Sequence, residues 1–306
     1  MIGIKQIGSY LPQNMTDNIA KAARFGESEA FLRSKIGATT LPKLEAQQNT
    51  SDLAVGAVES LLAKSDLKKE QIEALVVVTQ NGDYGGLPHT AAITQSKLGL
   101  PNTVSAFDIS LGCSGYVYGL SILKAHMQEM GFTNAVLVTA DPYSKIVDQD
   151  DRVTSLLFGD GATATLLSHD AVYDIKRPIL QTDGNGYDAL VKKNYLSMHG
   201  RKVFNFAAIN VPQQIDVYLT NNQLTVEDID LFLLHQGSAA IVEVIARKVG
   251  GDKTKFILDI DKTGNTVSST IPILLEKQLN KIDNKKIILS GFGVGLSWAT
   301  NLLERR

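Results

Sequence analysis

The chain has 306 residues, of which 44% are hydrophobic and 20% charged, with 30 basic and 32 acidic side chains. Its formal net charge of −2 shows no excess of the basic residues that bind nucleic acid. The single cysteine excludes an intrachain disulfide framework and a cysteine-rich zinc site, and the five histidines form no HExxH pair, so no metal site is expected.

Neither the N-terminus nor any apolar run carries an export or membrane signal. The first residues, MIGIKQIGSYLPQN, lack a basic region followed by a long apolar run, so no signal peptide is expected. No stretch approaches the roughly 20 consecutive apolar residues that cross a membrane. The sequence therefore predicts a cytoplasmic protein that has neither a membrane nor a nucleic acid as partner.

Short apolar, β-branched runs alternate with longer amphipathic stretches, which is typical of an α/β protein with buried sheets. In chain order, strands are expected at 75–80, 104–109, 135–140, 162–168, 231–236 and 286–293. Helices are expected between them, at 51–64, 88–98, 115–130, 209–220, 238–249 and 271–280. Within 115–130, apolar residues recur at helical spacing, which predicts that one face of this helix is buried.

The segment 169–200 has the least regular pattern, and we place the connection between two halves there. Residues 1–170 would form an N-terminal half that carries the cysteine, and residues 171–306 a C-terminal half. Both halves run strand, helix, strand and then a glycine-punctuated strand. Because no flexible linker separates them, the halves are expected to share one core.

Cys113 lies in DISLGCSGYVYGL, after an expected strand and just before an expected helix. A thiol at a helix N-terminus faces the positive end of the macrodipole and unpaired N–H groups, which favour the thiolate. Gly112 and Gly115 allow backbone and substrate to approach closely. A lone cysteine is more often a small buried hydrophobe, so its position alone leaves a nucleophile and a core residue about equally plausible.

Two polar residues follow expected strands in the second half. His235 ends the apolar run DLFLLH, at the strand end where α/β proteins gather their ligands. Asn265 lies in KTGNTVSSTIP, between an expected strand and a helix that begins near Ser268. Each also has an ordinary interpretation, His235 as a core or capping residue and Asn265 as a turn-former or cap.

Two glycine-rich segments look like phosphate loops but lack their context. GFGVGLSW (291–298) is followed by no Lys-Ser/Thr pair and by no helix and strand of a dinucleotide unit. FGDGATA (158–164) is more simply interpreted as a tight turn between strands.

Taken together, these segments resemble the initiating β-ketoacyl-acyl carrier protein synthases (type III) of the thiolase superfamily. The resemblance covers nearly the whole chain in order, through IGSYLPQN, DISLGCSGYVYGL, DDRVTSLLFGDGATA, MHGRKVFNFA, LFLLHQG, TGNTVSSTIP and SGFGVGLSWAT. It implies a five-layered α-β-α-β-α fold of two similar half-domains, usually assembled as a homodimer. It also implies a condensing acyltransferase of fatty acid or of specialised lipid or polyketide biosynthesis.

The resemblance assigns a role to each of the three polar or nucleophilic residues. Cys113 would be acylated by a primer thioester. His235 and Asn265 would hydrogen-bond the carbonyl oxygen of a malonyl thioester and stabilise the enolate formed as carbon dioxide leaves. The backbone N–H groups of Cys113 and Gly295 would form the oxyanion hole. Acyl-coenzyme A and acyl carrier protein are the implied partners, and no metal or redox cofactor is implied.

The substrate contacts depart from the family pattern. Phe31 and Lys35 stand where relatives commonly use Trp and Arg to hold coenzyme A, whereas Arg152 matches a contact to the pantetheine nucleotide. Lys lacks the fork geometry of Arg, so the grip on a nucleotide is expected to be weaker. Leu87 and Phe204 are expected to shape the acyl pocket, with Leu87 reaching across a two-fold axis into the partner subunit.

The carrier-protein contact departs as well. After the histidine the chain has HQGSAA, so Ala240 stands where relatives carry an arginine used in docking. Arg247 and Lys248 remain as a basic pair on the following helix. These differences predict a specialised relative rather than the housekeeping enzyme of fatty acid synthesis.

Two alternatives to condensation stay open on the sequence alone. An acyltransferase on the same fold would pass the acyl group from Cys113 to a hydroxyl or amine; such relatives often replace the asparagine with aspartate so that the histidine acts as a general base. Asn265 therefore favours condensation. The other alternative is a non-catalytic acyl-binding partner subunit, and the presence of all three residues argues against it.

Overall fold

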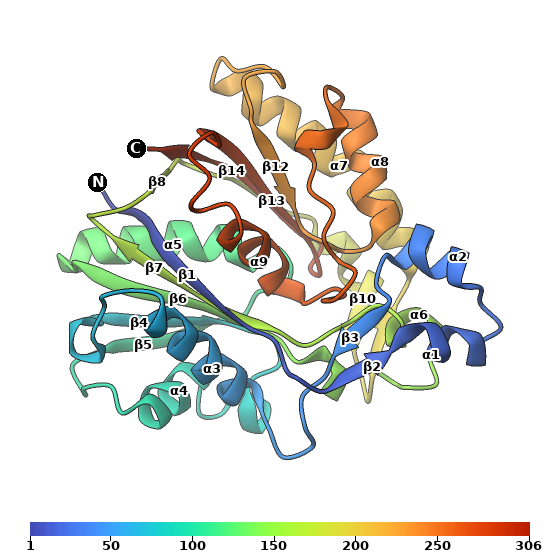
Figure 1. Ribbon diagram of the computed structural model, residues 1–306, viewed down its shortest axis with the longest axis horizontal. Helices are drawn as coiled ribbons and strands as arrows, with labels where there is room; N and C mark the ends of the chain where they lie inside the picture. Colours follow the sequence, from blue (N-terminus) through green and yellow to red (C-terminus); the bar gives the residue numbers. More distant parts are fainter.

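One mixed sheet organises the computed structural model, which describes residues 1–306 (Figure 1). Its ten strands run in the order β12-β13-β14-β8-β1-β7-β6-β4-β5, and β9 also pairs with β14. The β4–β5, β4–β6 and β12–β13 pairs are parallel and the others antiparallel. The strands are β1 (Gly3–Tyr10), β4 (Ala74–Val78), β5 (Ser105–Ile109), β6 (Asn134–Ala140), β7 (Ala162–Ser168), β8 (Tyr173–Ile175), β9 (Ile179–Thr182), β12 (Leu231–Leu234), β13 (Lys286–Gly293) and β14 (Ser297–Arg305).

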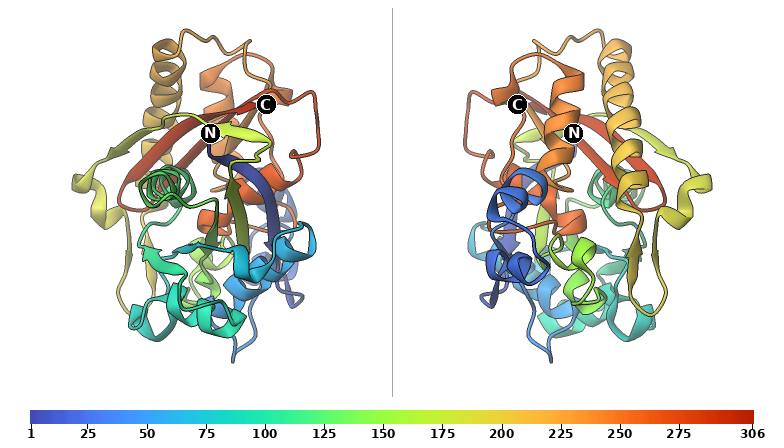
Figure 2. Two further views of the ribbon diagram at one scale, coloured as in Figure 1. Left: turned by 90° about the vertical axis from the view of Figure 1, so that its left-hand side faces the viewer. Right: turned by 90° about the vertical axis from the view of Figure 1, so that its right-hand side faces the viewer.

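Helices cover both ends of the stack and fill its middle, which confirms the five-layered architecture. α3 (Thr50–Ala63) and α4 (Thr90–Leu98) pack outside the strands of the first half. α5 (Gly115–Met130) and α9 (Thr270–Glu276) contact strands of both halves and form the central layer. α7 (Gly200–Asn221) packs on β13 and β14 and against α8 (Ala239–Val249), and Figure 2 shows these two at the opposite end from α3 and α4.

Inner strands such as β4 and β13 are apolar on both faces because each face meets a different core. In β4, Val76 and Val78 enter the central cluster, whereas Leu75 and Val77 enter the cluster under α3 and α4. β13 divides in the same way between the central cluster and the cluster under α7 and α8. Strands buried on both faces appear in the sequence as continuous hydrophobic runs, which is why these strands were predictable.

The segment 169–200 is more ordered than its pattern predicts, because short strands form there with distant partners. β8 pairs with both β1 and β14 and so joins the two sets of strands into one sheet. β10 (Leu190–Lys192) and β11 (Leu196–Met198) form a small hairpin beside the cavity described below. The division into halves at residue 170 stays a prediction.

A group of short elements lies near the carboxyl ends of β4, β6 and β12 (Figure 1). They are β2 (Met15–Asp17) paired with β3 (Thr40–Pro42), α1 (Asn18–Arg24), α2 (Glu29–Phe31), the π-helical turn Leu32–Ile36 and α6 (Arg152–Ser155). None of the helices combines the length and the apolar character that crossing a membrane takes.

Candidate active site

Cys113 occupies the sharp turn between β5 and α5, as the sequence predicts. The turn is tight, because a Cβ on Gly112 would lie 2.6 Å from Oε1 of Gln80 and a Cβ on Gly115 would lie 2.4 Å from Cγ1 of Val78. Close packing therefore favours glycine at both positions, although at Gly112 the nearest atom is the end of a flexible side chain. The packing holds Cys113 just before the N-terminus of α5, where the residue is 5% exposed.

Strand β13 passes directly against this turn, through glycines whose importance the sequence analysis missed. A Cβ on Gly293 would lie 2.7 Å from Sγ of Cys113, and one on Gly291 would lie 2.7 Å from its carbonyl oxygen. The repeated glycines of GFGVG were the available signal. They serve the close approach of a strand to the nucleophile rather than the binding of phosphate.

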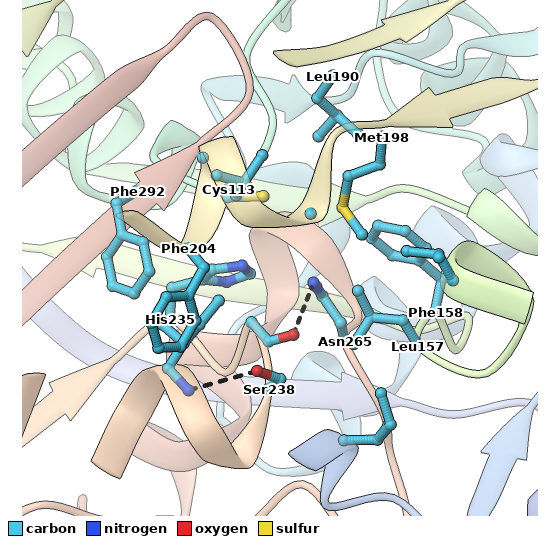
Figure 3. A pocket seen from close by; sticks show the side chains of 17 residues that line it. Cys113, Leu157, Phe158, Leu190, Met198, Phe204, His235, Ser238, Asn265 and Phe292 are labelled. Carbon is cyan, nitrogen blue, oxygen red and sulfur yellow. Dashed lines mark hydrogen bonds between the residues drawn. The ribbon is translucent and has the colours of Figure 1, made fainter. Parts of the chain in front are cut away.

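Cys113, His235 and Asn265 line one cavity of about 160 Å³. Figure 3 shows the three side chains around the same hollow, although they come from the β5–α5 turn, the end of β12 and the loop before α9. The rest of the lining is largely apolar and includes Leu157, Phe158, Leu190, Met198, Phe204 and Phe292. Such a cavity suits an acyl chain held next to a few polar groups.

The imidazole of His235 is buried and packed in a fixed orientation. Its ring meets Phe292 edge-on, with centroids 5.3 Å apart and planes at 83°. Its Nδ1 atom lies 2.8 Å from Oγ1 of Thr270. Burial lowers the pKa of His235 to about 3, against the opposite effect of the Val267 carbonyl. The ring is therefore neutral near pH 7 and holds one proton.

The amide of Asn265 is oriented by the backbone that follows it. The Val267 N–H donates to its Oδ1 at 2.9 Å, so the Oδ1 atom faces the turn and the NH₂ group is left for other acceptors. The NH₂ group makes only a long contact, 3.5 Å, to the carbonyl oxygen of Gly237. Val267 holds a left-handed conformation with φ of 55°, which a β-branched residue adopts only under constraint.

Three consecutive hydroxyl groups fasten this turn to its surroundings. Ser268 Oγ donates to Oδ2 of Asp141 at 2.8 Å, and Ser269 Oγ donates to the Thr139 carbonyl at 3.1 Å. Thr270 is the third, and it contacts His235. The sequence analysis did not single out Asp141 or Thr270, because nothing in their spacing marks them as neighbours of the catalytic candidates.

The ionisation of Cys113 differs from the expectation. Burial raises the pKa of the thiol to about 12, while the backbone N–H groups of Val294 and Cys113 lower it and buried Asp141 raises it. Desolvation by the apolar cavity thus outweighs the helix N-terminus, and the resting group is a thiol rather than a thiolate. Between β13 and β14, the backbone N–H that lowers the pKa of the thiol belongs to Val294, the neighbour of Gly295.

The predicted substrate contacts separate into two regions. Phe204 lines the central cavity and also an adjoining groove of about 450 Å³. Lys35, Ala240 and Arg247 line this groove, which we call the outer groove. Lys248 lies instead beside a hollow between α7 and α8, so the predicted basic pair does not share one surface.

The other three predicted contacts lie outside both spaces. Arg152 forms an ion pair with Glu27, a residue that the sequence analysis missed. Phe31 is partly exposed at the end of α2. Leu87 is 84% exposed and does not line the cavity of its own chain.

Comparisons with known proteins agree with the geometry. The family model "3-Oxoacyl-[acyl-carrier-protein (ACP)] synthase III" matches residues 107–184, and the model of the C-terminal part of the same family matches residues 219–305. The β-ketoacyl-[acyl-carrier-protein] synthase III of Lactococcus lactis subsp. lactis is 32% identical, and the alignment covers 98% of each protein. A crystal structure of a 3-oxoacyl-(acyl-carrier-protein) synthase III superposes with a TM-score of 0.93 at 31% identity, covering 99% of both chains. The Thermus thermophilus enzyme gives a TM-score of 0.91 at 30% identity, again covering 99% of both chains.

Proposed function

This chain belongs to the β-ketoacyl-acyl carrier protein synthase III family, and from that premise we propose which residues carry out its reaction. The reaction is the decarboxylative condensation of an acyl primer with a malonyl-acyl carrier protein, in fatty acid or polyketide biosynthesis. In class terms the chain is a condensing transferase with a thiolase-like fold. We propose the finer class of acyltransferase, because the primer's acyl group moves first to Cys113 and then to carbon.

The first half-reaction exchanges one thioester for another. The sulfur of Cys113 attacks the primer carbonyl, a new S–C bond forms, and the carrier thiol leaves with the proton that the cysteine gives up. The oxyanion that forms on the way would be held by the N–H groups of Cys113 and Gly295. The first N–H belongs to the same residue as the sulfur, and Gly295 follows Val294, whose backbone N–H lowers the pKa of the thiol, in the turn between β13 and β14.

The second half-reaction makes the carbon–carbon bond. Carbon dioxide leaves the malonyl thioester, and the electron pair moves into an enolate whose oxygen accepts hydrogen bonds from His235 and Asn265. The enolate carbon attacks the acyl group on Cys113, whose sulfur departs and takes up a proton. No redox cofactor is needed, because neither half-reaction transfers electrons to or from an external group, and no metal is proposed, because His235 and Asn265 supply the hydrogen bonds to the enolate oxygen.

The observation that carries this assignment is the meeting of Cys113, His235 and Asn265 in one apolar cavity. A cavity of about 160 Å³ is small beside the roughly 300–1,000 Å³ of ligand pockets in general, which favours a short acyl primer. Acyl-coenzyme A and acyl carrier protein are the proposed partners, and the cytoplasm the proposed location.

Three variants test the assignment by separating the half-reactions. Cys113→Ala should gain no acyl mass when incubated with a short acyl-coenzyme A, whereas the unmodified protein gains one. His235→Ala and Asn265→Ala should still acylate, but should lose malonyl decarboxylation by about a hundredfold or more, as enzymes do when one oxyanion donor is removed. Acylation that persists in Cys113→Ala, or normal decarboxylation by both other variants, would contradict the assignment.

We also propose that the chain is a homodimer. β5 lies at the edge of the sheet, and Phe107, Ile109 and Leu111 on and beside it are only partly buried. Nearby in the sequence, Tyr84 and Leu87 are 80% and 84% exposed. An unpaired edge strand beside exposed apolar side chains is a surface that association with a second copy would cover.

A further inference from the structure

Thr270 carries the only side-chain hydroxyl group that is hydrogen-bonded to the ring of His235. We propose that Thr270 is a positioning residue that keeps the proton of His235 on Nε2, so that this atom can donate a hydrogen bond to the thioester oxygen. The inference deepens the proposed function and rests on it, since the tautomer matters only if His235 acts as a donor.

The single proton of the neutral imidazole decides which ring nitrogen can donate. A neutral imidazole has one proton, so Nε2 can donate only if Nδ1 is an acceptor. Nδ1 lies 2.8 Å from Oγ1 of Thr270, which is a good hydrogen-bond distance. The N–H of Val267 donates to Oδ1 of Asn265, and the Val267 carbonyl that acts on the ring is an acceptor, so neither group can donate to Nδ1. The hydroxyl of Thr270 is the donor that lies at Nδ1.

The hydroxyl has one competing acceptor, the carbonyl oxygen of Val267 at 3.2 Å. If the proton pointed there, Nδ1 would have to carry the imidazole proton, and the lone pair of Nε2 would face the negative enolate oxygen. The contact to Nδ1 is the shorter of the two, 2.8 Å against 3.2 Å, and we assign the hydroxyl proton to this contact.

The position of the hydroxyl is itself fixed. Thr270 is 3% exposed in the first turn of α9, and the two preceding serines bind Asp141 and Thr139. A β-branched side chain in a helix also has few rotamers available. The hydroxyl oxygen of Thr270 is therefore held next to His235 in one side-chain conformation.

The decisive measurement is the tautomer itself. Nitrogen chemical shifts of protein labelled with ¹⁵N-histidine distinguish a protonated from an unprotonated ring nitrogen, and His235→Ala identifies the signals of His235 among the five histidines. We expect a protonated Nε2 and an unprotonated Nδ1 in the unmodified protein. In Thr270→Val the Val267 carbonyl becomes the main neighbour of Nδ1, so we expect the proton to move to Nδ1.

Activity should follow the tautomer. Thr270→Val should lose malonyl decarboxylation by about a hundredfold, comparable to removal of one oxyanion donor, yet still acylate Cys113. Thr270→Ser, which keeps the hydroxyl, should restore decarboxylation. Thr94→Val is a matched control, because Thr94 is also fully buried in a helix but donates only to the Thr90 carbonyl within α4.

Two spectra would overturn the inference: a proton on Nδ1 in the unmodified protein, or an unchanged tautomer in Thr270→Val. The unmodified spectrum decides even if Thr270→Val does not fold. Failure of the proposed function is a separate result, since it would appear as an unmodified protein that does not decarboxylate malonyl thioester at all.

Discussion

At the scale of single residues, the apolar cavity decides which groups carry charge. Burial lowers the pKa of His235 to about 3 and raises that of Cys113 to about 12, so both are neutral near pH 7. In the proposed function, His235 would then act as a hydrogen-bond donor rather than as a cation, and its contribution would not depend on a proton from solvent.

The neutrality of His235 has a measurable consequence. The rate of malonyl decarboxylation should show no step near pH 6.5, the usual pKa of histidine, because the lowered pKa keeps the ring neutral from about pH 5 to about pH 8. The measurement is carbon dioxide release across this range with saturating malonyl carrier protein. A rate that falls by half near pH 6.5 in the unmodified protein, together with a flat profile in His235→Ala, would show that His235 titrates in this range.

Asp141 gives a second, independent pH effect. It is fully buried, and burial raises its pKa to about 7 although Gln80, Ser268 and Thr79 donate hydrogen bonds that lower it. Since the pKa in the folded protein exceeds the unfolded value of 3.8, the folded state binds the proton more tightly. The contribution of Asp141 to stability is therefore full below about pH 4 and is lost as the pH rises towards about 7.

Asp141→Asn should remove this dependence, because asparagine is neutral and keeps most of the hydrogen bonds. We expect the melting temperature of the variant, relative to the unmodified protein, to rise as the pH increases from about 4 to about 8. Thermal unfolding of both proteins over this range is the measurement. A relative melting temperature that falls with pH would mean that Asp141 is a stabilising carboxylate.

At the scale of helices and strands, the sequence predicts most strands that are buried on both faces, although it misses β14, and it misses what depends on distant partners. β7 and β13 are predicted with their observed bounds, and α5 likewise. β1 was missed, because GIKQIGSY mixes polar residues and glycine and becomes a strand only between β7 and β8. β8 to β11 were missed because each has only three or four residues, too few to show a pattern.

The residues of the candidate site also fall into those that the sequence marks and those that it does not. Cys113, His235 and Asn265 stand at recognisable turns, but only the resemblance to a family brought them together, since spacing along the chain does not predict that three loops meet. Thr270, Gly293 and Glu27 matter through contacts with residues far away in the sequence. Such contacts follow from packing and have no local pattern.

The exposed edge of β5 predicts assembly. We expect a homodimer by light scattering at micromolar protein, with an apolar interface that includes Leu87. Leu87→Asp should weaken the dimer, because a charge would be buried without a partner. Met130→Asp is the matched control, since Met130 is also exposed, at 54%, but lies at the far end of α5. A monomeric unmodified protein would contradict the proposal.

At the scale of the whole molecule, two arginines in the elements near the cavity are held in ion pairs. Arg152 is paired with Glu27, and Arg33 with Glu29. Lys35 and Arg247 remain in the outer groove, and a lysine contacts phosphate without the two-pronged geometry of arginine. A nucleotide phosphate would have to displace Glu27 to reach Arg152.

We therefore expect weak use of acetyl-coenzyme A and better turnover with a dedicated carrier or an unusual acyl donor. Glu27→Gln should raise kcat/KM for acyl-coenzyme A donors, because it frees Arg152 for phosphate, whereas Glu29→Gln should have a smaller effect. Kinetics with a panel of donors and malonyl carrier protein provide the test. A kcat/KM for acetyl-coenzyme A near ~10⁴ M⁻¹s⁻¹ or above in the unmodified protein would identify a housekeeping initiator instead.

The close passage of β13 behind the nucleophile also bears on how this enzyme would respond to a covalent inhibitor. A drug bonded to the sulfur of Cys113 rests in a space whose rear wall is the backbone of Gly293, where any added side chain would lie 2.7 Å from the sulfur. A resistance mutation at Gly293 would block the drug and the natural acyl group alike. Resistance mutations would instead have to arise at residues whose side chains line the cavity, above all Leu190 and Met198 on the β10–β11 hairpin. An inhibitor that makes most of its contacts with the backbone near Cys113 would leave the organism few viable routes to resistance.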